Sequence, residues 1–276
     1  SVGATNDYGH PTPEALAREQ QILDRLDAGA GQGRAFMAPD RAMVRLQEAA
    51  RELGLERAGV DSWQLNEGQL AAGVAILSGT DRFLNIQGVA GAGKSTLLGA
   101  LDKVLGSEGV KLIGLAFQNK MVADLRGGAS GTMSVEQMKE AGIEAWTIAG
   151  FINKHGSAAA QGSGERFEAS KAALSNTVII TDESSMVSSR DMLRLTAIAE
   201  QLDVAKAPFM GDRQQLSAIE QGKMFAVSQA AGQATVRMDE NIRQRNSPLL
   251  LAVAGLSNEG HASLALDLLA AHGRVI

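Results

Sequence analysis

A glycine-rich stretch, GVAGAGKST (88–96), carries the most recognisable chemistry in this sequence. Its spacing fits G-x-x-x-x-G-K-[ST], with an apolar strand-like run before it and a helix-like run after it. Glycines let backbone N–H groups turn toward phosphate oxygens, the start of a helix adds partial positive charge, and the lysine reaches the terminal phosphates. The pattern predicts a nucleotide phosphate site, whereas the alternative is a glycine-rich turn. We expect contacts from Gly88, Gly91, Gly93, Lys94, Ser95 and Thr96, with Ser95 also holding Mg²⁺.

A second pattern, NTVIITDESSM (176–186), supplies the carboxylates that hydrolysis needs. Its β-branched run ends in Asp182 and Glu183, so both side chains leave the carboxyl end of a strand, where open parallel sheets bind ligands. We expect Asp182 to hold Mg²⁺ and Glu183 to orient and deprotonate the attacking water. The alternative is that the pair only caps the helix that follows.

Three further residues complete the predicted site. APFMGDRQQLSAI (207–219) ends a strand before Gln215, whose amide can sense the γ-phosphate and move the backbone on hydrolysis. MDENIRQR (238–245) offers Arg243 to stabilise charge in the transition state, unless this segment is only a solvated basic turn. Upstream, LNEGQ (65–69) places the amide of Gln69 where it can pair with the N6 and N7 edge of adenine. The predicted cofactors are therefore ATP and Mg²⁺.

The elements that must position these residues follow an alternating pattern after about residue 61. Short apolar runs predict strands, and helical patterns separate most of them, which indicates an α/β fold with a parallel sheet covered by helices on both faces. The segment 153–173 is rich in Gly, Ala and Ser, and we interpret it as a flexible loop. The predicted strands are 83–87, 111–117, 177–181, 207–210 and 235–238.

The first 60 residues have a different character. After a polar start that we expect to be disordered, apolar residues recur at helical spacing in two stretches separated by glycines. We predict three parts: residues 1–60 as a disordered start and small helical module, 61–250 as a nucleotide-binding lobe, and 251–276 as the truncated start of the following region.

Composition excludes several classes of function. The 276 residues contain no cysteine and four histidines without metal-ligand spacing, which excludes disulfides and thiolate chemistry and argues against a histidine metal centre. A net charge of −5 argues against a broad basic face for nucleic acid but permits a local groove. No apolar run approaches the roughly 20 residues of a transmembrane helix, and the start lacks a signal-peptide pattern, so we expect a cytoplasmic protein.

Together these segments resemble the motor domain of superfamily-one DNA helicases of the RecD-like branch. LNEGQ, GVAGAGKST, LIGLAFQNKMVADL (112–125), EAWTIAGFI (144–152), IITDESSM, MGDRQQLSAI and ENIRQR follow that family's order over about residues 61–245. The wording TDESSM and the stretch from residue 241 to the end are similar to the helicase portions of conjugative relaxases of the TraI and TraA types.

The resemblance implies two RecA-like lobes that bind ATP between them and translocate along single-stranded DNA in the 5′ to 3′ direction. It implies that Phe117, Asn119 and Thr147 contact DNA, although the aromatic rings of Phe117 and Phe151 fit a core equally well. Relatives usually carry histidine where this chain has Ala149, and nothing after Arg245 resembles the later helicase motifs. We therefore expect one lobe with weak ATPase activity and no unwinding by itself.

The implied partners are single-stranded DNA and plasmid transfer proteins. Two other functions stay open: a RecD-like repair or phage helicase, and a nucleotide-responsive module that binds single-stranded DNA without turnover.

Overall fold

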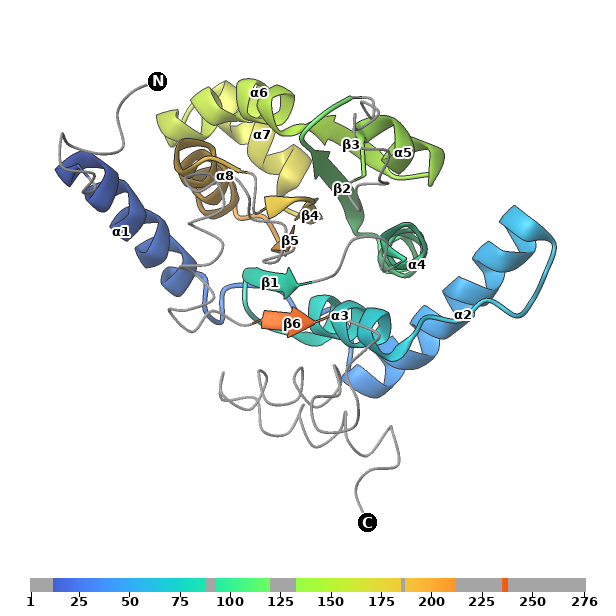
Figure 1. Ribbon diagram of the computed structural model, residues 1–276. Coiled ribbons are helices and arrows are strands. Elements are labelled where there is room, and N and C mark those ends of the chain that lie inside the picture. The colour runs from blue at the N-terminus through green and yellow to red at the C-terminus, as the bar shows by residue number, and fades with distance from the viewer. Residues whose placement is uncertain (1–11, 88–92, 120–132, 185–186, 212–234, 238–276) are drawn as a thin grey trace, which may run out of the picture.

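A parallel β-sheet forms the centre of the protein (Figure 1). The computed structural model describes residues 12–87, 93–119, 133–184, 187–211 and the backbone of 235–237. Within these residues six strands lie in the order β3-β2-β4-β5-β1-β6, and every recorded strand pair is parallel. The strands are β1 (Phe83–Gln87), β2 (Lys111–Ala116), β3 (Glu144–Thr147), β4 (Thr177–Thr181), β5 (Ala207–Gly211) and β6 (Thr235–Arg237).

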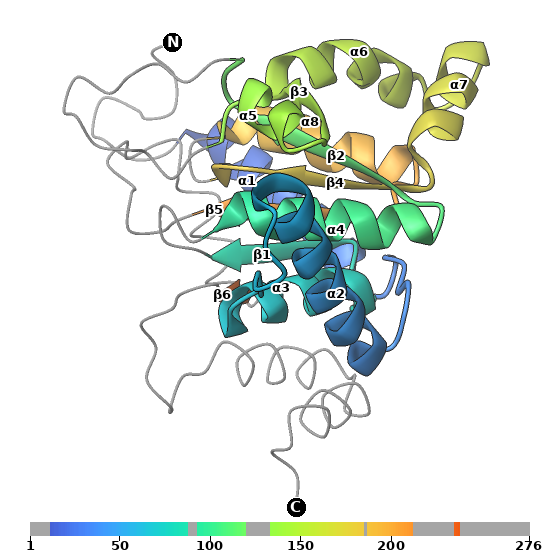
Figure 2. The same ribbon diagram turned by 90° about the vertical axis from the view of Figure 1, so that its right-hand side faces the viewer.

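Helices cover both faces of this sheet, which confirms the predicted fold class (Figure 2). Because successive strand residues point to opposite faces, Leu112 packs into one apolar cluster and Ile113 into the other. The first cluster joins the sheet to α2 (Pro39–Ala58), α3 (Glu67–Ser78), α4 (Lys94–Ser107) and α5 (Val135–Glu140). The second joins it to α1 (Pro13–Ala28), α6 (Ile148–Gln161), α7 (Glu165–Leu174) and α8 (Ser189–Gln201).

The prediction of a flexible loop over 153–173 is wrong, because this segment lies in α6 and α7. The side-chain oxygen of Thr147 accepts the backbone N–H of Gly150 at 3.0 Å and so caps the start of α6. Phe151, Ile152 and His155 then recur at helical spacing on the buried face. A composition rich in Gly, Ala and Ser concealed this periodicity.

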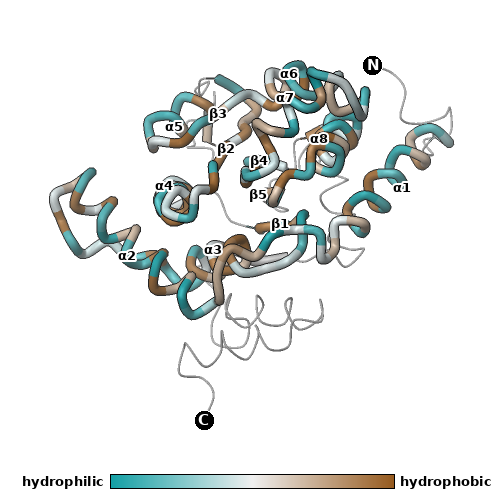
Figure 3. Tube along the Cα trace, turned by 180° about the vertical axis from the view of Figure 1, so that it is seen from behind, coloured by the Kyte–Doolittle hydropathy of each residue, from teal (hydrophilic) through white to brown (hydrophobic). Residues whose placement is uncertain are grey.

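The two leading helices, α1 and α2, pack against other helices that cover the sheet. α1 contributes Ile22 and Leu26 to the cluster that contains α8, whereas α2 packs against α3 and α4 in the other cluster. Figure 3 shows α1 and α2 with alternating hydrophobic and hydrophilic positions, as expected of helices with one face in the core. The three-part division of the chain stays a prediction, and residues 238–276 lie outside the described residues.

A buried histidine joins α6 to α7. Nδ1 of His155 lies 3.1 Å from Oγ of Ser170, and its ring contacts that of Phe151 with centroids 4.9 Å apart. Burial, and to a lesser extent the positive charge of Lys154, lowers the pKa of His155 below its ordinary value of 6.5. The neutral ring is therefore the form that the fold accommodates.

This lowered pKa predicts acid sensitivity. Because the unfolded chain binds a proton at His155 more readily than the folded chain, the stability contributed by the neutral ring is complete above pH 6.5 and is lost as the pH falls through the folded-state pKa. We expect the free energy of unfolding of the wild type to fall more steeply below pH 6.5 than that of His155→Gln. Urea unfolding of both proteins from pH 8 to pH 5 measures this, and parallel curves would contradict it.

Candidate active site

The start of α4 places Lys94 and its neighbours. Gly93 precedes the helix in the left-handed region, with φ of 72° and ψ of 32°, a conformation that favours glycine. Lys94 is the first residue of α4 and its side chain is buried, whereas Ser95 is exposed and Thr96 half-buried. The predicted contacts Gly88 and Gly91 lie outside the described residues. A helix start with a glycine before it and a lysine in its first turn is a typical anion site.

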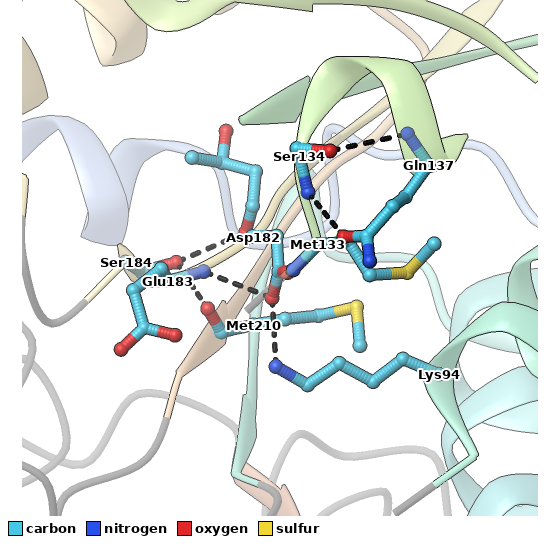
Figure 4. A network of polar contacts seen from close by, with 9 residues as sticks. Lys94, Met133, Ser134, Gln137, Asp182, Glu183, Ser184 and Met210 are labelled. Carbon is cyan, nitrogen blue, oxygen red and sulfur yellow. Dashed lines mark hydrogen bonds and ion pairs between the residues drawn. The ribbon is translucent and has the colours of Figure 1, made fainter. Parts of the chain in front are cut away.

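Asp182 stands opposite Lys94, immediately after β4 (Figure 4). Its Oδ1 accepts a hydrogen bond from Lys94 Nζ at 2.9 Å, and its side chain is 1 % exposed. Two backbone N–H groups also donate to this carboxylate, Glu183 to Oδ1 and Met133 to Oδ2, each at 2.9 Å. The carboxylate is thus charge-paired and hydrogen-bonded, as burial of an ion requires. The structure therefore brings together two residues that lie 88 positions apart in the sequence.

Glu183 has an unusual backbone conformation. Its φ is 54°, in the left-handed region that non-glycine residues rarely adopt, and the residue is 6 % exposed. In Figure 4 its carboxyl group extends away from the Lys94–Asp182 pair. Non-glycine residues in this region cluster at active sites, where surrounding contacts hold them. The turn thus gives the two adjacent carboxylates different directions and environments.

Ser184 helps to hold this turn, and sequence reasoning missed it. Its Oγ lies 3.1 Å from the carbonyl oxygen of Thr181 and 2.8 Å from that of Met210. Since Thr181 ends β4 and Met210 lies in β5, the hydroxyl joins the two strand ends. A serine directly after a predicted Asp-Glu pair was the signal that could have found it.

Gln69 does not present its amide to open space in this structure. Its Oε1 accepts the backbone N–H of Asn66 and its Nε2 donates to the carbonyl oxygen of Gly93, both at 2.8 Å. The side chain therefore touches the residue before Lys94 and belongs to the site. Its pairing with adenine stays a prediction.

A magnesium ion fits the donors at this site. Among the described residues no three His, Asp or Glu side chains group into a metal-binding set. Mg²⁺ at nucleotide sites is commonly held by one or two carboxylates, waters and phosphate oxygens, so it needs no such set. The carboxylate of Asp182 and the hydroxyl of Ser95 are oxygen donors of the type that would hold it.

Comparison with known families agrees with this geometry. Residues 64–276 match the family described as AAA domain, which is more than half of the chain. The chain belongs to the AAA domain family. This membership and the relatives below confirm the resemblance to helicase motor domains of the RecD-like type.

Curated relatives of this AAA domain are conjugation proteins. The chain is 33 % identical over 199 residues to the multifunctional conjugation protein TraI of Escherichia coli (strain K12), covering 71 % of the chain and 10 % of TraI. It is 27 % identical over 255 residues to the probable conjugal transfer protein TraA of Sinorhizobium fredii, covering 92 % and 20 % respectively. A conjugal transfer protein TraA of Agrobacterium fabrum is 29 % identical over 215 residues, covering 77 % and 17 %. The chain thus spans only a fifth or less of these relatives.

The predicted DNA contacts of the AAA domain lie at neighbouring strand ends. Ala116 of β2 pairs with Thr147 of β3, so Phe117 and Thr147 leave the same edge of the sheet. Phe117 is 45 % exposed and Asn119 is exposed, whereas Thr147 uses its hydroxyl to cap α6. Phe151 is 1 % exposed, so of the two alternatives for its ring, a place in the core and a contact with DNA, the structure supports the core.

The remaining predicted site residues of the AAA domain are not placed. Gln215 and Arg243 lie outside the described residues, so their roles stay predictions.

In the part of the chain that the structure describes, no helix has the length and apolar character that crossing a bilayer requires.

Proposed function

We propose that this AAA domain is the first motor lobe of an ATP-dependent DNA helicase that acts on single-stranded DNA in conjugative plasmid transfer. One observation carries the proposal: Lys94 at a helix start pairs with Asp182 at the carboxyl edge of a parallel sheet, and Glu183 follows Asp182 in the same turn after the strand. These are the groups that binding and hydrolysing a nucleoside triphosphate require.

The contacts around Asp182 support an exchange of partners by Lys94. A terminal phosphate oxygen competes with the carboxylate for the lysine, so Nζ leaves Asp182 when ATP binds. Asp182 keeps the N–H donors of Met133 and Glu183, which would hold the carboxylate in an orientation in which it could ligate Mg²⁺. Bound Mg²⁺ would neutralise phosphate charge. Glu183, whose carboxyl group points elsewhere, accepts the proton of the attacking water.

The start of α5 offers a connection between this chemistry and the predicted DNA contacts. The backbone N–H of Met133 donates to Asp182, and the N–H of Glu136 donates to the carbonyl oxygen of Asn119 at 3.0 Å. Residues 133–136 therefore contact both Asp182, the proposed magnesium ligand, and Asn119, which lies just after β2. Movement of DNA against Phe117 and Asn119 would reach Asp182 through this segment.

The conjugative role rests on the relatives. TraI and both TraA proteins carry conjugation or conjugal transfer in their names. The similarity to each of them covers 71 % or more of this chain. We extend that role to this chain and, with it, a cytoplasmic location and contact with transfer proteins.

The test is ATP hydrolysis by the natural chain that carries these 276 residues, with and without single-stranded DNA. We expect faster hydrolysis with DNA than without it, and a loss of activity in Lys94→Ala, because the lysine contacts the terminal phosphates. A matched control is Lys171→Ala on α7, where the lysine lies over the ring of Phe167; α7 precedes the amino end of β4, whereas Asp182 follows its carboxyl end. Nucleotide binding without DNA-dependent turnover would overturn the motor function in favour of a nucleotide-responsive DNA-binding module.

A further inference from the structure

A glutamine on the leading helix α2 holds the segment that carries Gln69. Nε2 of Gln47 donates to the carbonyl oxygen of Leu65 at 3.0 Å, and Oε1 of Gln47 accepts the N–H of Leu65 at 2.8 Å. One side-chain amide thus satisfies both polar backbone groups of a residue that is 4 % exposed. This pairing fixes the backbone of Leu65 relative to α2.

Next to Leu65, further hydrogen bonds lead to Gly93, the residue before Lys94. Asn66 and Gln69 form a capping box, in which each side chain accepts the backbone N–H of the other residue at 2.8 Å. Nε2 of Gln69 then donates to the carbonyl oxygen of Gly93 at 2.8 Å. The contact leaves no space at Gly93, because a Cβ built there would lie 2.1 Å from Nε2 of Gln69.

The seating of α2 gives this connection a firm base. α2 packs against both α3 and α4, and a Cβ built on Gly73 of α3 would lie only 2.6 Å from Cδ1 of Leu46 on α2. Such close packing leaves α2 little freedom to shift or rotate relative to α3. A change in Gln47 is therefore transmitted to Leu65 rather than absorbed by movement of the helix.

We propose that Gln47 is a positioning residue for nucleotide binding, which acts through Leu65, Asn66 and Gln69 on the conformation of Gly93. This role of Gln47 rests on the proposed function only in that Gly93 and Lys94 must bind a nucleotide. Helix α2, which precedes the matched family region 64–276, thereby contributes to the site. Gln47 touches no reacting atom and acts only by holding Gly93 in its binding conformation.

The physical reason is the cost of ordering. Without Gln47 the buried N–H and C=O groups of Leu65 lose their partners, and the segment from Leu65 to Gln69 samples conformations that relieve them. The nucleotide then binds only those molecules in which Gln69 contacts Gly93. The apparent Kd equals the intrinsic Kd divided by the fraction of molecules in that conformation, so it rises as this fraction falls. We expect a rise in Kd of about threefold to tenfold, which is within the range that coupling through packed contacts produces.

The experiment measures Kd for a fluorescent ATP analogue with Mg²⁺, kcat for ATP hydrolysis and thermal unfolding, for this chain and two variants of Gln47. Gln47→Met has a similar length and cannot pair with Leu65, whereas Gln47→Glu keeps the acceptor for the Leu65 N–H. The matched control is Gln20→Met on α1, because Gln20 is exposed and its amide donates to Asp24 on the same helix. Lys94→Ala gives the baseline without specific binding.

We expect Kd to rise from the wild type through Gln47→Glu to Gln47→Met, with kcat unchanged within about twofold and Gln20→Met equal to the wild type. A Kd that stays at the wild-type value in folded Gln47→Met would overturn the proposal, whatever happens to its unfolding temperature. If Gln47→Met does not fold, Gln47→Glu decides in the same way. Absence of nucleotide binding by the wild type would instead contradict the proposed function.

Discussion

Replacing Glu183 with glutamine is expected to lower kcat for ATP hydrolysis by about 10²–10⁴-fold, because the variant loses the base that accepts the proton of the attacking water. The introduced amide has nearly the same shape as the carboxylate and can still orient a water molecule, so ATP affinity should change little. The left-handed backbone at this position and the N–H bond from residue 183 to Asp182 do not depend on the side-chain charge. The effect should therefore appear in kcat and leave the Kd of Mg·ATP within about twofold.

Single-turnover hydrolysis in the presence of single-stranded DNA, with a separate measurement of ATP affinity, tests this expectation. Glu168→Gln is the matched control, because Glu168 lies exposed in the first turn of α7 and the variant makes the same chemical change away from the site. A Glu183→Gln protein that retains more than about a tenth of wild-type kcat would rule out Glu183 as the base.

Much of the fold and part of the site were predictable because their signals are local. β1 and β4 are short, mostly apolar runs that end at polar residues, and their side chains are almost entirely buried. Lys94 and Asp182 belong to patterns whose spacing is set by the phosphate loop and the strand end, so each could be found separately. Their direct ion pair required only that both lie at the same sheet edge.

The rest depends on contacts that no short segment reveals. β3 has four residues, of which Glu144 is exposed, and it forms an edge strand only because β2 offers backbone partners. The pairing of Gln47 with Leu65 joins residues on a helix and in a loop, and nothing in the sequence distinguishes Gln47 from the other polar residues of α2. Long-range hydrogen bonds of this kind become visible only when packing has placed the two segments side by side.

Replacing Lys94 with methionine should weaken both nucleotide binding and the fold. The variant leaves the buried Asp182 carboxylate without its counter-charge, and breaking a buried ion pair from one side costs about 3–5 kcal/mol. Because Met133 and Glu183 still donate their N–H groups, we expect the lower end, about 3 kcal/mol, in the free energy of unfolding measured by urea. ATP affinity should fall by about tenfold or more, because a charge-assisted bond to phosphate is lost. Lys103→Met is the control for stability, because it makes the same change on the same helix but breaks an ion pair with the exposed Glu56.

The double variant Lys94→Met with Asp182→Asn separates the structural part of this effect from the chemical part. Removing both charges removes the uncompensated carboxylate, so stability should recover by about 1–3 kcal/mol relative to the sum of the single variants. Recovery remains incomplete, because the amide nitrogen of the introduced asparagine cannot accept one of the two backbone N–H groups that now bond to Asp182. ATP hydrolysis should stay absent, since neither the phosphate contact of Lys94 nor the metal contact of Asp182 returns. Strictly additive losses of stability in a double-mutant cycle would show that the pair contributes nothing as a pair, and hydrolysis by the double variant would remove both residues from the mechanism.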